Sequence, residues 1–350
     1  MSNSLEVDFL AVGNGEKSGD AIAIRWGDFS DASKQYVVVI DGGTTESGEA
    51  LVKLIKEIYK TAFVGLVICT HPDGDHSSGL RVVLNELGVG KLWMHRPWDR
   101  SGEISHMFKD GRITNDSLGE RLREAYNFAH ELQKIAKEKN IPIEEPFAGK
   151  TISGGGAKIT ILGPSEDAYV SLIPNFAKSP EVKVATERFS AGLKEAVNWV
   201  KEALHIETLD ESGETTAENN SSVVSLFEFD VKRVLFTGDA GIPAMKEVIN
   251  YADRQGISLE NISLFQVPHH GSRRNISPSI LNRIKAGTAY ISAAKKAEKH
   301  PAKKVVNACI RRKMSVFSTK GNSLCHHHNA PFREGYSAAT QLEFSEMVEE

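Results

Sequence analysis

The sequence predicts an α/β fold in which buried strands alternate with amphipathic helices around a common core. Short apolar, β-branched runs end at glycine or at a polar residue, as residues 35–40 end at Asp41. Helical spacing of apolar residues follows such runs, for example over residues 47–60. The chain has 350 residues, of which 40% are hydrophobic and 25% are charged, which is typical of a globular protein with a sizeable core.

The first hundred residues show this alternation most clearly. Gly13 and Gly15 predict a turn between two leading strands, and a later buried strand runs directly into His71. We expect strands at residues 6–12, 21–26, 35–40, 63–70 and 91–95, and helices at residues 47–60 and 78–87.

The middle of the chain is richer in helical and polar stretches. We expect helices at residues 118–139 and 177–205, a strand at 158–162 after a glycine-rich turn, and a polar, acidic loop at 209–220. Residues 98–148 and 165–218 are therefore interpreted as insertions into the common core. Such insertions are expected to form a lid, or a surface for an oligomer or a dedicated protein partner.

The last third of the chain returns to strands. A turn at residues 230–232 joins two apolar runs, which is the pattern of a β-hairpin. We expect strands at residues 222–229, 233–237, 262–267, 288–292 and 314–318, and a helix at residues 243–251.

Composition excludes several classes of protein. The longest apolar runs, residues 36–40 and 62–69, are far shorter than the ~20 residues that span a bilayer, so no membrane association is expected. The N-terminal residues have a strand-like pattern rather than that of a signal peptide. The three cysteines cannot form a disulfide framework, so we expect a cytoplasmic protein.

Positive charge is concentrated near the C-terminal end. Residues 271–320 hold thirteen Lys or Arg side chains against one acid, Glu298, although the whole chain has a formal charge of −4. Such a run is often only a solvated helix face. It also fits an anionic substrate, including a nucleic acid or a nucleotide, that is attracted to one side of the molecule.

A cluster of metal-ligand residues follows the strand at residues 63–70. His71, Asp73, Asp75 and His76 lie within six residues, on a loop that leaves a strand and enters a helix. Such a loop turns its first two ligands to one side and its last two to another, so that two cations ~3.5–4 Å apart can be held together.

Two later strand ends carry the same kinds of side chain. Asp239 follows the strand at residues 233–237, and His269 and His270 follow the strand at 262–267. Each pattern alone is weak, but loops at strand ends are where α/β proteins build sites. Together the three strand ends predict a dinuclear metal site.

The chain resembles the metallo-β-lactamase superfamily. THPDGDHSSGL is similar to the superfamily signature in its His-x-Asp-x-Asp-His form. Together with VGNGEKSGDAIAI, VIDGG, NNSSVVSLFEFDVKRVLFTGDA, VPHHGS and His300-Pro301, it resembles the soluble hydrolase domain of bacterial competence (DNA-uptake) proteins. The likeness covers residues 5–95, 149–164 and 219–320. It implies one αββα four-layer sandwich over residues 1–350, with a two-metal hydrolase site at one rim.

The resemblance also implies roles for single residues. Asp41 matches an acid that orients the metal ligands, and we expect Asp75 and His270 to take part in catalysis. Residues expected to contact the substrate are Asn220, Ser272 and Arg273. The expected metal ligands are His71, Asp73, Asp75, His76, Asp239 and one histidine of the 269–270 pair, taken as His269.

The sequence departs from the superfamily pattern in two places. Many members carry a further metal-binding histidine at the position of residues 218–222, where this chain has none. Asp73 replaces a histidine and makes the site richer in oxygen, which favours Mn²⁺ or Mg²⁺ relative to an all-histidine zinc site. We expect two divalent ions, Zn²⁺ or Mn²⁺, with Mg²⁺ as a further candidate. The membrane channel of competence proteins is absent, so DNA transport is not inferred.

The leading hypothesis is a phosphodiesterase or nuclease that uses a metal-activated hydroxide on a nucleic acid or a nucleotide. Two alternatives remain: hydrolysis of an ester, lactone or thioester on the same site, and a non-catalytic scaffold or sensor subunit. The internal cluster Cys325–His328 is expected to be an exposed loop near the site, with a second metal site as the alternative.

Overall fold

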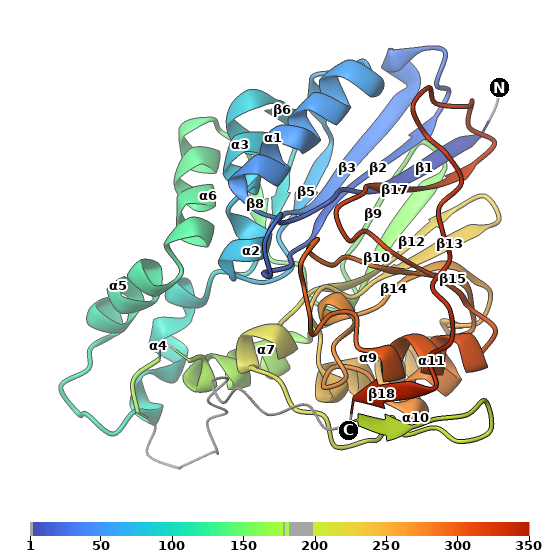
Figure 1. Cartoon of the computed structure of the whole chain (residues 1–350). Coiled ribbons are helices and arrows are strands. Elements are labelled where there is room, and N and C mark those ends of the chain that lie inside the picture. The colour runs from blue at the N-terminus through green and yellow to red at the C-terminus, as the bar shows by residue number, and fades with distance from the viewer. Residues whose placement is uncertain (1–2, 178, 182–198, 350) are drawn as a thin grey trace.

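The computed structural model describes residues 3–177, 179–181 and 199–349 and shows two large β-sheets packed face to face between helices (Figure 1). Within this described part each sheet has seven strands. The predicted helix at residues 177–205 falls largely on residues 178 and 182–198, which lie outside the description. None of the described helices is long and apolar enough to cross a membrane.

The N-terminal sheet is antiparallel at one edge and parallel at the other. Strand β3 pairs antiparallel with β2 on one side and parallel with β5 on the other. The strand order is β17 (Leu324–His328), β1 (Ser4–Phe9), β2 (Ala21–Gly27), β3 (Gln35–Gly42), β5 (Leu66–Ile68), β7 (Leu92–Trp93) and β8 (Ile143–Glu144).

The C-terminal sheet repeats this arrangement. Its β12–β13 hairpin is antiparallel, and β13 then pairs parallel with β14. The strand order is β16 (Ser315–Ser318), β15 (Ala286–Ile291), β14 (Ile262–Gln266), β13 (Lys232–Phe236), β12 (Val224–Phe229), β10 (Ala157–Gly163) and β9 (Thr151–Gly154). Two short pairs lie outside the sheets: β4 (Phe63–Val64) with β6 (Gly88–Val89), and β11 (Trp199–Lys201) with β18 (Met347–Glu349).

Helices cover the outer faces of both sheets (Figure 1). On the N-terminal sheet these include α1 (Thr45–Lys53), which continues as the π-helical turn η2 (Leu54–Ile58), α3 (Leu80–Glu86) and α6 (Asn127–Glu138). On the C-terminal sheet they are α9 (Ile242–Gln255), α10 (Pro278–Arg283) and α11 (Lys303–Arg311). The remaining helices are α2 (Gly74–Ser77), α4 (Ser101–Ile104), α5 (Asn115–Ala125), α7 (Glu166–Leu172) and α8 (Ala217–Asn220).

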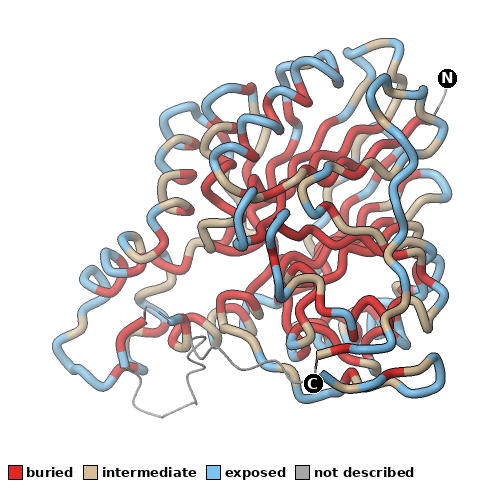
Figure 2. Tube along the Cα trace, viewed as in Figure 1, coloured by how far each residue is buried: buried red, intermediate tan, exposed pale blue. Residues whose placement is uncertain are grey.

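Three apolar clusters follow from strand alternation. Successive side chains of a strand point to opposite faces, so Val37 and Val39 of β3 pack in the cluster beneath α1 and α3. Val38 and Ile40 of the same strand pack in the cluster between the two sheets. A third cluster lies between the C-terminal sheet and α9–α11. In Figure 2 the buried residues lie mainly in the middle of the molecule, as this αββα layering requires. The predicted fold class is confirmed.

Close backbone contact holds the loop after β5 against the end of β3. A Cβ atom on Gly79 would lie 1.9 Å from the carbonyl oxygen of Gly42, and one on Gly48 would lie 2.2 Å from the carbonyl oxygen of Gly79. Only glycine permits this approach. The loop that carries His71 and His76 is therefore fixed to both β3 and α1.

Two helix predictions are wrong in detail. The helix predicted at residues 118–139 is two helices, α5 and α6, which meet at Tyr126 with a non-helical backbone. The Tyr126 hydroxyl donates to Glu218 Oε1 at 2.6 Å, a tertiary contact that local spacing does not reveal. In the described part of the predicted helix at 177–205, residues Trp199–Lys201 form a strand paired with β18.

From the sequence we expected the cluster Cys325–His328 to be an exposed loop, and this expectation is wrong. These residues belong to β17, which pairs antiparallel with β1 and places Cys325 opposite Asp8. Among the described residues, the three histidines of this strand join no group of three or more closely spaced His, Cys, Asp or Glu ligands. The cluster is therefore part of the edge strand of the N-terminal sheet.

A buried ion cluster attaches the C-terminal segment to this edge. Arg333 donates from Nε to Glu6 Oε1 at 2.9 Å and from Nη1 to Asp8 Oδ1 at 2.6 Å. Arg25 also pairs with Glu6, and the hydroxyl of Tyr59 donates to Asp8. Because both acids are buried, the two guanidinium groups supply most of the compensation for their lost hydration.

Replacing Arg333 by glutamine is expected to lower the free energy of unfolding by roughly 3 kcal/mol, because a buried ion pair loses one partner. Urea denaturation measures the change. The exposed Arg121 is a matched control, and Arg121→Gln should shift stability by less than ~0.5 kcal/mol. Equal effects of the two substitutions would contradict a stabilising role for the cluster.

Candidate metal centre

The loop after β5 brings four predicted ligands to the edge where the sheets meet. His71 leaves the strand, Asp73 is the N-cap residue of α2, and Asp75 and His76 lie within that helix. His71 and His76 are buried, whereas the side chain of Asp73 is 39% exposed. His71 Nε2 lies 3.7 Å from Asp73 Oδ2.

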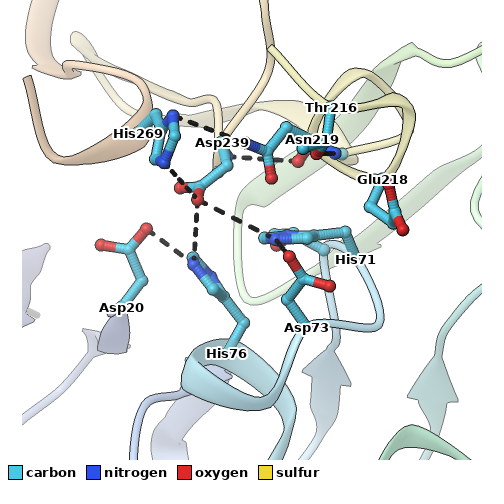
Figure 3. A network of polar contacts seen from close by, with 12 residues as sticks. Asp20, His71, Asp73, His76, Thr216, Glu218, Asn219, Asp239 and His269 are labelled. Atoms are coloured by element: carbon cyan, nitrogen blue, oxygen red, sulfur yellow. Dashed lines mark hydrogen bonds and ion pairs between the residues drawn. The ribbon is translucent and has the colours of Figure 1, made fainter. Parts of the chain in front are cut away.

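Asp239, which follows β13, lies at the centre of the cluster. Its Oδ2 atom is 3.4 Å from His76 Nε2 and 3.9 Å from His71 Nε2. The Nε2 atoms of His269 and His270 are each 3.7 Å from the same oxygen. Figure 3 shows His71 and His76, from the segment after β5, and His269, from the segment after β14, directed toward Asp239. The three predicted strand ends therefore meet at one carboxylate.

Hydrogen bonds set which imidazole nitrogens face inward. The single hydroxyl proton of Thr70 is donated to Asp41 Oδ2 at 2.6 Å, so the hydroxyl must accept at its 3.1 Å contact with His71 Nδ1. His76 Nδ1 donates to Asp41 Oδ2 at 2.7 Å. In both rings Nδ1 carries the proton, and Nε2 is the nitrogen left to bind a cation.

The same logic applies to His269. Its Nδ1 lies 2.8 Å from Asn275 Oδ1, and Asn275 Nδ2 donates to the backbone oxygen of Asp239 at 2.8 Å. The second bond fixes the amide orientation, so His269 Nδ1 is the donor. Its side chain is 28% exposed, whereas that of His270 is 4% exposed.

His270 belongs to a compact ligand group with Asp75 and His76. One ligand atom from each of these three residues lies within 4.8 Å of the others, and Asp20, His76 and Asp239 form a second such group. Among the residues that the structure describes, neither ring nitrogen of His270 has a hydrogen-bond partner. From the sequence we expected His269 to bind the metal and His270 to take part in catalysis; among the described residues it is His270, and not His269, that belongs to such a ligand group.

Buried polar atoms without partners mark the place of a cation. Nitrogen and oxygen atoms left unpaired inside a protein are costly unless an ion or water satisfies them. Around Asp239 the atoms that lack a partner within the described part of the chain are Asp20 Oδ1, His71 Nε2, His76 Nε2, Asp239 Oδ1 and both ring nitrogens of His270. Imidazole nitrogen and carboxylate oxygen are the donors that divalent transition metals use, so the residues fit such ions.

The electrostatics of the cluster agree with this fit. Although burial opposes it, the carboxylates of Asp239 and Asp41 raise the pKa of His76, so this end of the site stabilises positive charge. Burial raises the pKa of Asp20 to about 8 and that of Asp73 to about 7, and neighbouring carboxylates act in the same direction. Burial lowers the pKa of His270 to about 4, which keeps this ring neutral and able to bind a metal.

The three predicted substrate residues lie in different places. Ser272 and Arg273 line a cavity that borders His269. The side chain of Asn220 instead donates to the backbone oxygen of Thr216 at 3.1 Å and lines another cavity. It is the neighbouring Asn219 whose Nδ2 approaches His269 Nδ1 at 3.4 Å.

Sequence reasoning missed several residues of the site. Asp20 is buried beside His76, at 3.8 Å, and accepts from Gln266. The buried Glu218 lies near Asp73 (Figure 3), and its Oε2 has no partner in the described part of the chain. The His300 ring lies 5.8 Å from that of His269. Asp20 and His300 stand in motifs that carried the family resemblance, which was the available signal.

The fold and the site define a class of protein: an αββα sandwich with a multi-ligand metal centre at the edge shared by its two sheets. The model of the metallo-beta-lactamase superfamily matches residues 29–295, and the chain belongs to this superfamily, most of whose members are metal-dependent hydrolases. No curated protein matches the chain. The finer resemblance to competence proteins stays a prediction.

Several solved structures are similar to the chain at low identity. Unliganded yeast PDE1 is 11% identical, with 91% of this chain and 98% of that one covered and a TM-score of 0.45. A protein of Parabacteroides distasonis described as a metal-dependent hydrolase is 10% identical, with coverages of 91% and 98% and a TM-score of 0.42. A mutant of the CmlA beta-hydroxylase is 11% identical with a TM-score of 0.44; the match covers 93% of this chain but only 54% of that one.

Purified protein is expected to contain about two divalent ions per chain, because more possible ligands converge near Asp239 than a single ion requires. Chelation should lower the unfolding temperature, since an ion that binds only the folded state stabilises it. Elemental mass spectrometry and thermal unfolding measure both. The double variant Asp75→Ala/His76→Ala should lose metal, and an unchanged content below one ion per chain would contradict the site.

Asp41→Asn is expected to weaken metal binding by about ten- to a hundredfold, the usual effect of removing a group that orients a ligand. Asp41 has a left-handed backbone with φ of 55°, which asparagine also adopts, but one amide oxygen cannot replace two carboxylate oxygens. Competition with a chromophoric chelator measures the affinity. The exposed acid substitution Asp116→Asn should leave it unchanged.

Proposed function

We propose that this protein is a phosphodiesterase with a dinuclear metal site that hydrolyses a nucleotide or nucleic-acid substrate. The observation that supports it most is the convergence of four imidazole Nε2 atoms within 4 Å of Asp239 Oδ2. A lone structural carboxylate does not need four such neighbours. A carboxylate placed in this way would be able to bind two cations together.

The ligands divide into two groups in this proposal. His71 and Asp73 would hold one ion, Asp75, His76 and His270 would hold the other, and Asp239 would contribute to both. Bound divalent ions supply a hydroxide nucleophile near neutral pH and offset negative charge on the phosphoryl oxygens. With Glu218 and Asn219 at the position of the missing histidine, the first group has fewer nitrogen ligands and is the weaker of the two.

His269 is proposed to move a proton during the reaction. Asn275 holds its Nδ1 proton, so Nε2 is the atom that accepts and returns a proton near the leaving group. The partial exposure of this side chain and its place on the cavity lining fit this role. His270, which is buried and unpaired, fits a metal ligand instead.

The charge near the site favours an anionic substrate of limited size. Many cations of residues 271–320 are neutralised by acids elsewhere in the chain: Arg283 by Asp253, Lys285 by Glu260, Arg311 by Glu202 and Arg312 by Glu207. The run is therefore not one continuous basic face. The cations on the cavity lining beside His269 include Arg273 and Arg274, which supports recognition of an anionic substrate there.

The Mn²⁺- or Zn²⁺-loaded protein is expected to hydrolyse bis(p-nitrophenyl) phosphate. His269→Gln should lower kcat by about 10²- to 10⁴-fold, as the loss of a general acid or base does, while metal content is retained. His270→Gln should instead lose metal. Absorbance of released nitrophenolate and elemental analysis of the same samples separate the two effects.

The alternative function, hydrolysis of an ester by the same site, is tested in the same experiment. Binding of phosphate by Arg and Lys weakens with salt, so the KM for phosphodiesters should rise between low and high salt. The proposal would be overturned if metal-loaded protein hydrolysed neutral p-nitrophenyl acetate rapidly and independently of salt but did not turn over the phosphodiester. That result would support an ester hydrolase.

A further inference from the structure

A cavity next to the metal ligands extends the site. A cavity of about 500 Å³ lies between the 209–216 loop, the residues after His269 and the first turn of α11. It is continuous with the metal centre, because His269 and Asn219 belong to its lining. Its cationic members are Arg273, Arg274 and Lys304, and its acidic members are Asp210 and Glu214.

Lys304 is the unusual member of this lining. It is only 5% exposed, and within the described part of the chain its ammonium group makes no ion pair with a carboxylate. Burial and the neighbouring Arg273 lower its pKa, since both oppose a charged ammonium group. The carboxylate of Asp210 is used locally, because its Oδ1 accepts from the backbone and hydroxyl of Ser212.

A buried ammonium without a carboxylate partner costs stability, and placing it beside a guanidinium adds repulsion. Packing does not require the charge, since an apolar side chain of similar length would fill the same position. The two acids of the lining, Asp210 and Glu214, are exposed, whereas Lys304 is buried. An anion that enters the cavity would compensate Lys304.

We infer that this cavity binds a second phosphate group of the substrate, one that is not cleaved, through Lys304 with Arg273 beside it. The inference rests on the proposed function and narrows it: the substrate class is a nucleotide with a terminal phosphate next to the scissile phosphodiester, as in a 5′-phosphorylated dinucleotide. The hydroxyl of Ser272, on the same lining, adds a neutral donor suited to phosphate oxygen.

The test compares two substrates that differ only in this phosphate. Metal-loaded protein should cleave the thymidine dinucleotide with a 5′-terminal phosphate about ten- to a hundredfold more efficiently, by kcat/KM, than the same dinucleotide without it, the range expected for hydrogen bonds to a charged group. Lys304→Met should abolish this preference. Turnover of bis(p-nitrophenyl) phosphate, which lacks a second phosphate, should be unchanged in the variant.

A neighbouring lysine supplies the matched control. Lys303 lies on the same turn of α11, is exposed, and has its Nζ 4.7 Å from the centre of the Trp199 ring. It does not line the cavity, so Lys303→Met removes the same charge from the same helix and should keep the preference. Lys304→Met should also unfold at an equal or higher temperature than the parent, because its buried charge serves the ligand and not the fold.

A readout without turnover separates this inference from the proposed function. Inorganic phosphate titrated into metal-free protein in a calorimeter should bind the parent and Lys303→Met, and bind Lys304→Met at least tenfold more weakly. If bis(p-nitrophenyl) phosphate is cleaved but neither the substrate preference nor the phosphate affinity depends on Lys304, the inference is overturned and the proposed function stands.

The converse result has the opposite meaning. If no phosphodiester is cleaved while phosphate binding depends on Lys304 as expected, the proposed function fails and the anion site is supported. A fall in unfolding temperature for Lys304→Met, with no change in phosphate binding, would assign the lysine to the fold and would overturn the inference.

Discussion

The site depends on the buried carboxylate of Asp239. Four imidazole nitrogens from two loops lie within 4 Å of one of its oxygens. Buried nitrogen and oxygen atoms crowded in this way are costly unless positive charge compensates them. The outer hydrogen bonds then become intelligible. Thr70, Asp41 and Asn275 act on the far nitrogen of three of these rings and leave Nε2 of each facing inward.

The sandwich supplies the rigidity that this arrangement needs. The ligand loop after β5 is held to β3 and α1 by backbone contacts that no side chain at Gly79 would permit. Asp239 and the pair His269–His270 come from the ends of β13 and β14, which are parallel neighbours in the C-terminal sheet. Because these ends and the loop after β5 belong to facing sheets with a common apolar interior, a small change in sheet packing would alter the distances between the two sets of ligands.

Local sequence patterns reveal the strands and the ligand loops but not the partners that arrive from elsewhere. Asp239 and His76 follow recognisable strand ends, and the α/β class follows from alternation alone. The break at Tyr126 and the strand Trp199–Lys201 depend on tertiary contacts, with Glu218 and β18 respectively. Asp20 was missed because one acid at the start of a strand has no distinctive spacing. His269 and His270 differ in burial and in hydrogen-bond partners, which adjacent residues of the same type do not reveal.

Two groups of buried charge in this molecule show how stability and function differ. Glu6 and Asp8 are buried under Arg25 and Arg333, and the acids are matched by guanidinium groups with short hydrogen bonds. Lys304 is comparably buried but has no carboxylate within ion-pair distance among the described residues, and it faces a cavity. A fold that can match its buried charges so closely at one edge has no structural reason to leave one unmatched beside its metal ligands. In our proposal this unmatched charge takes part in substrate recognition.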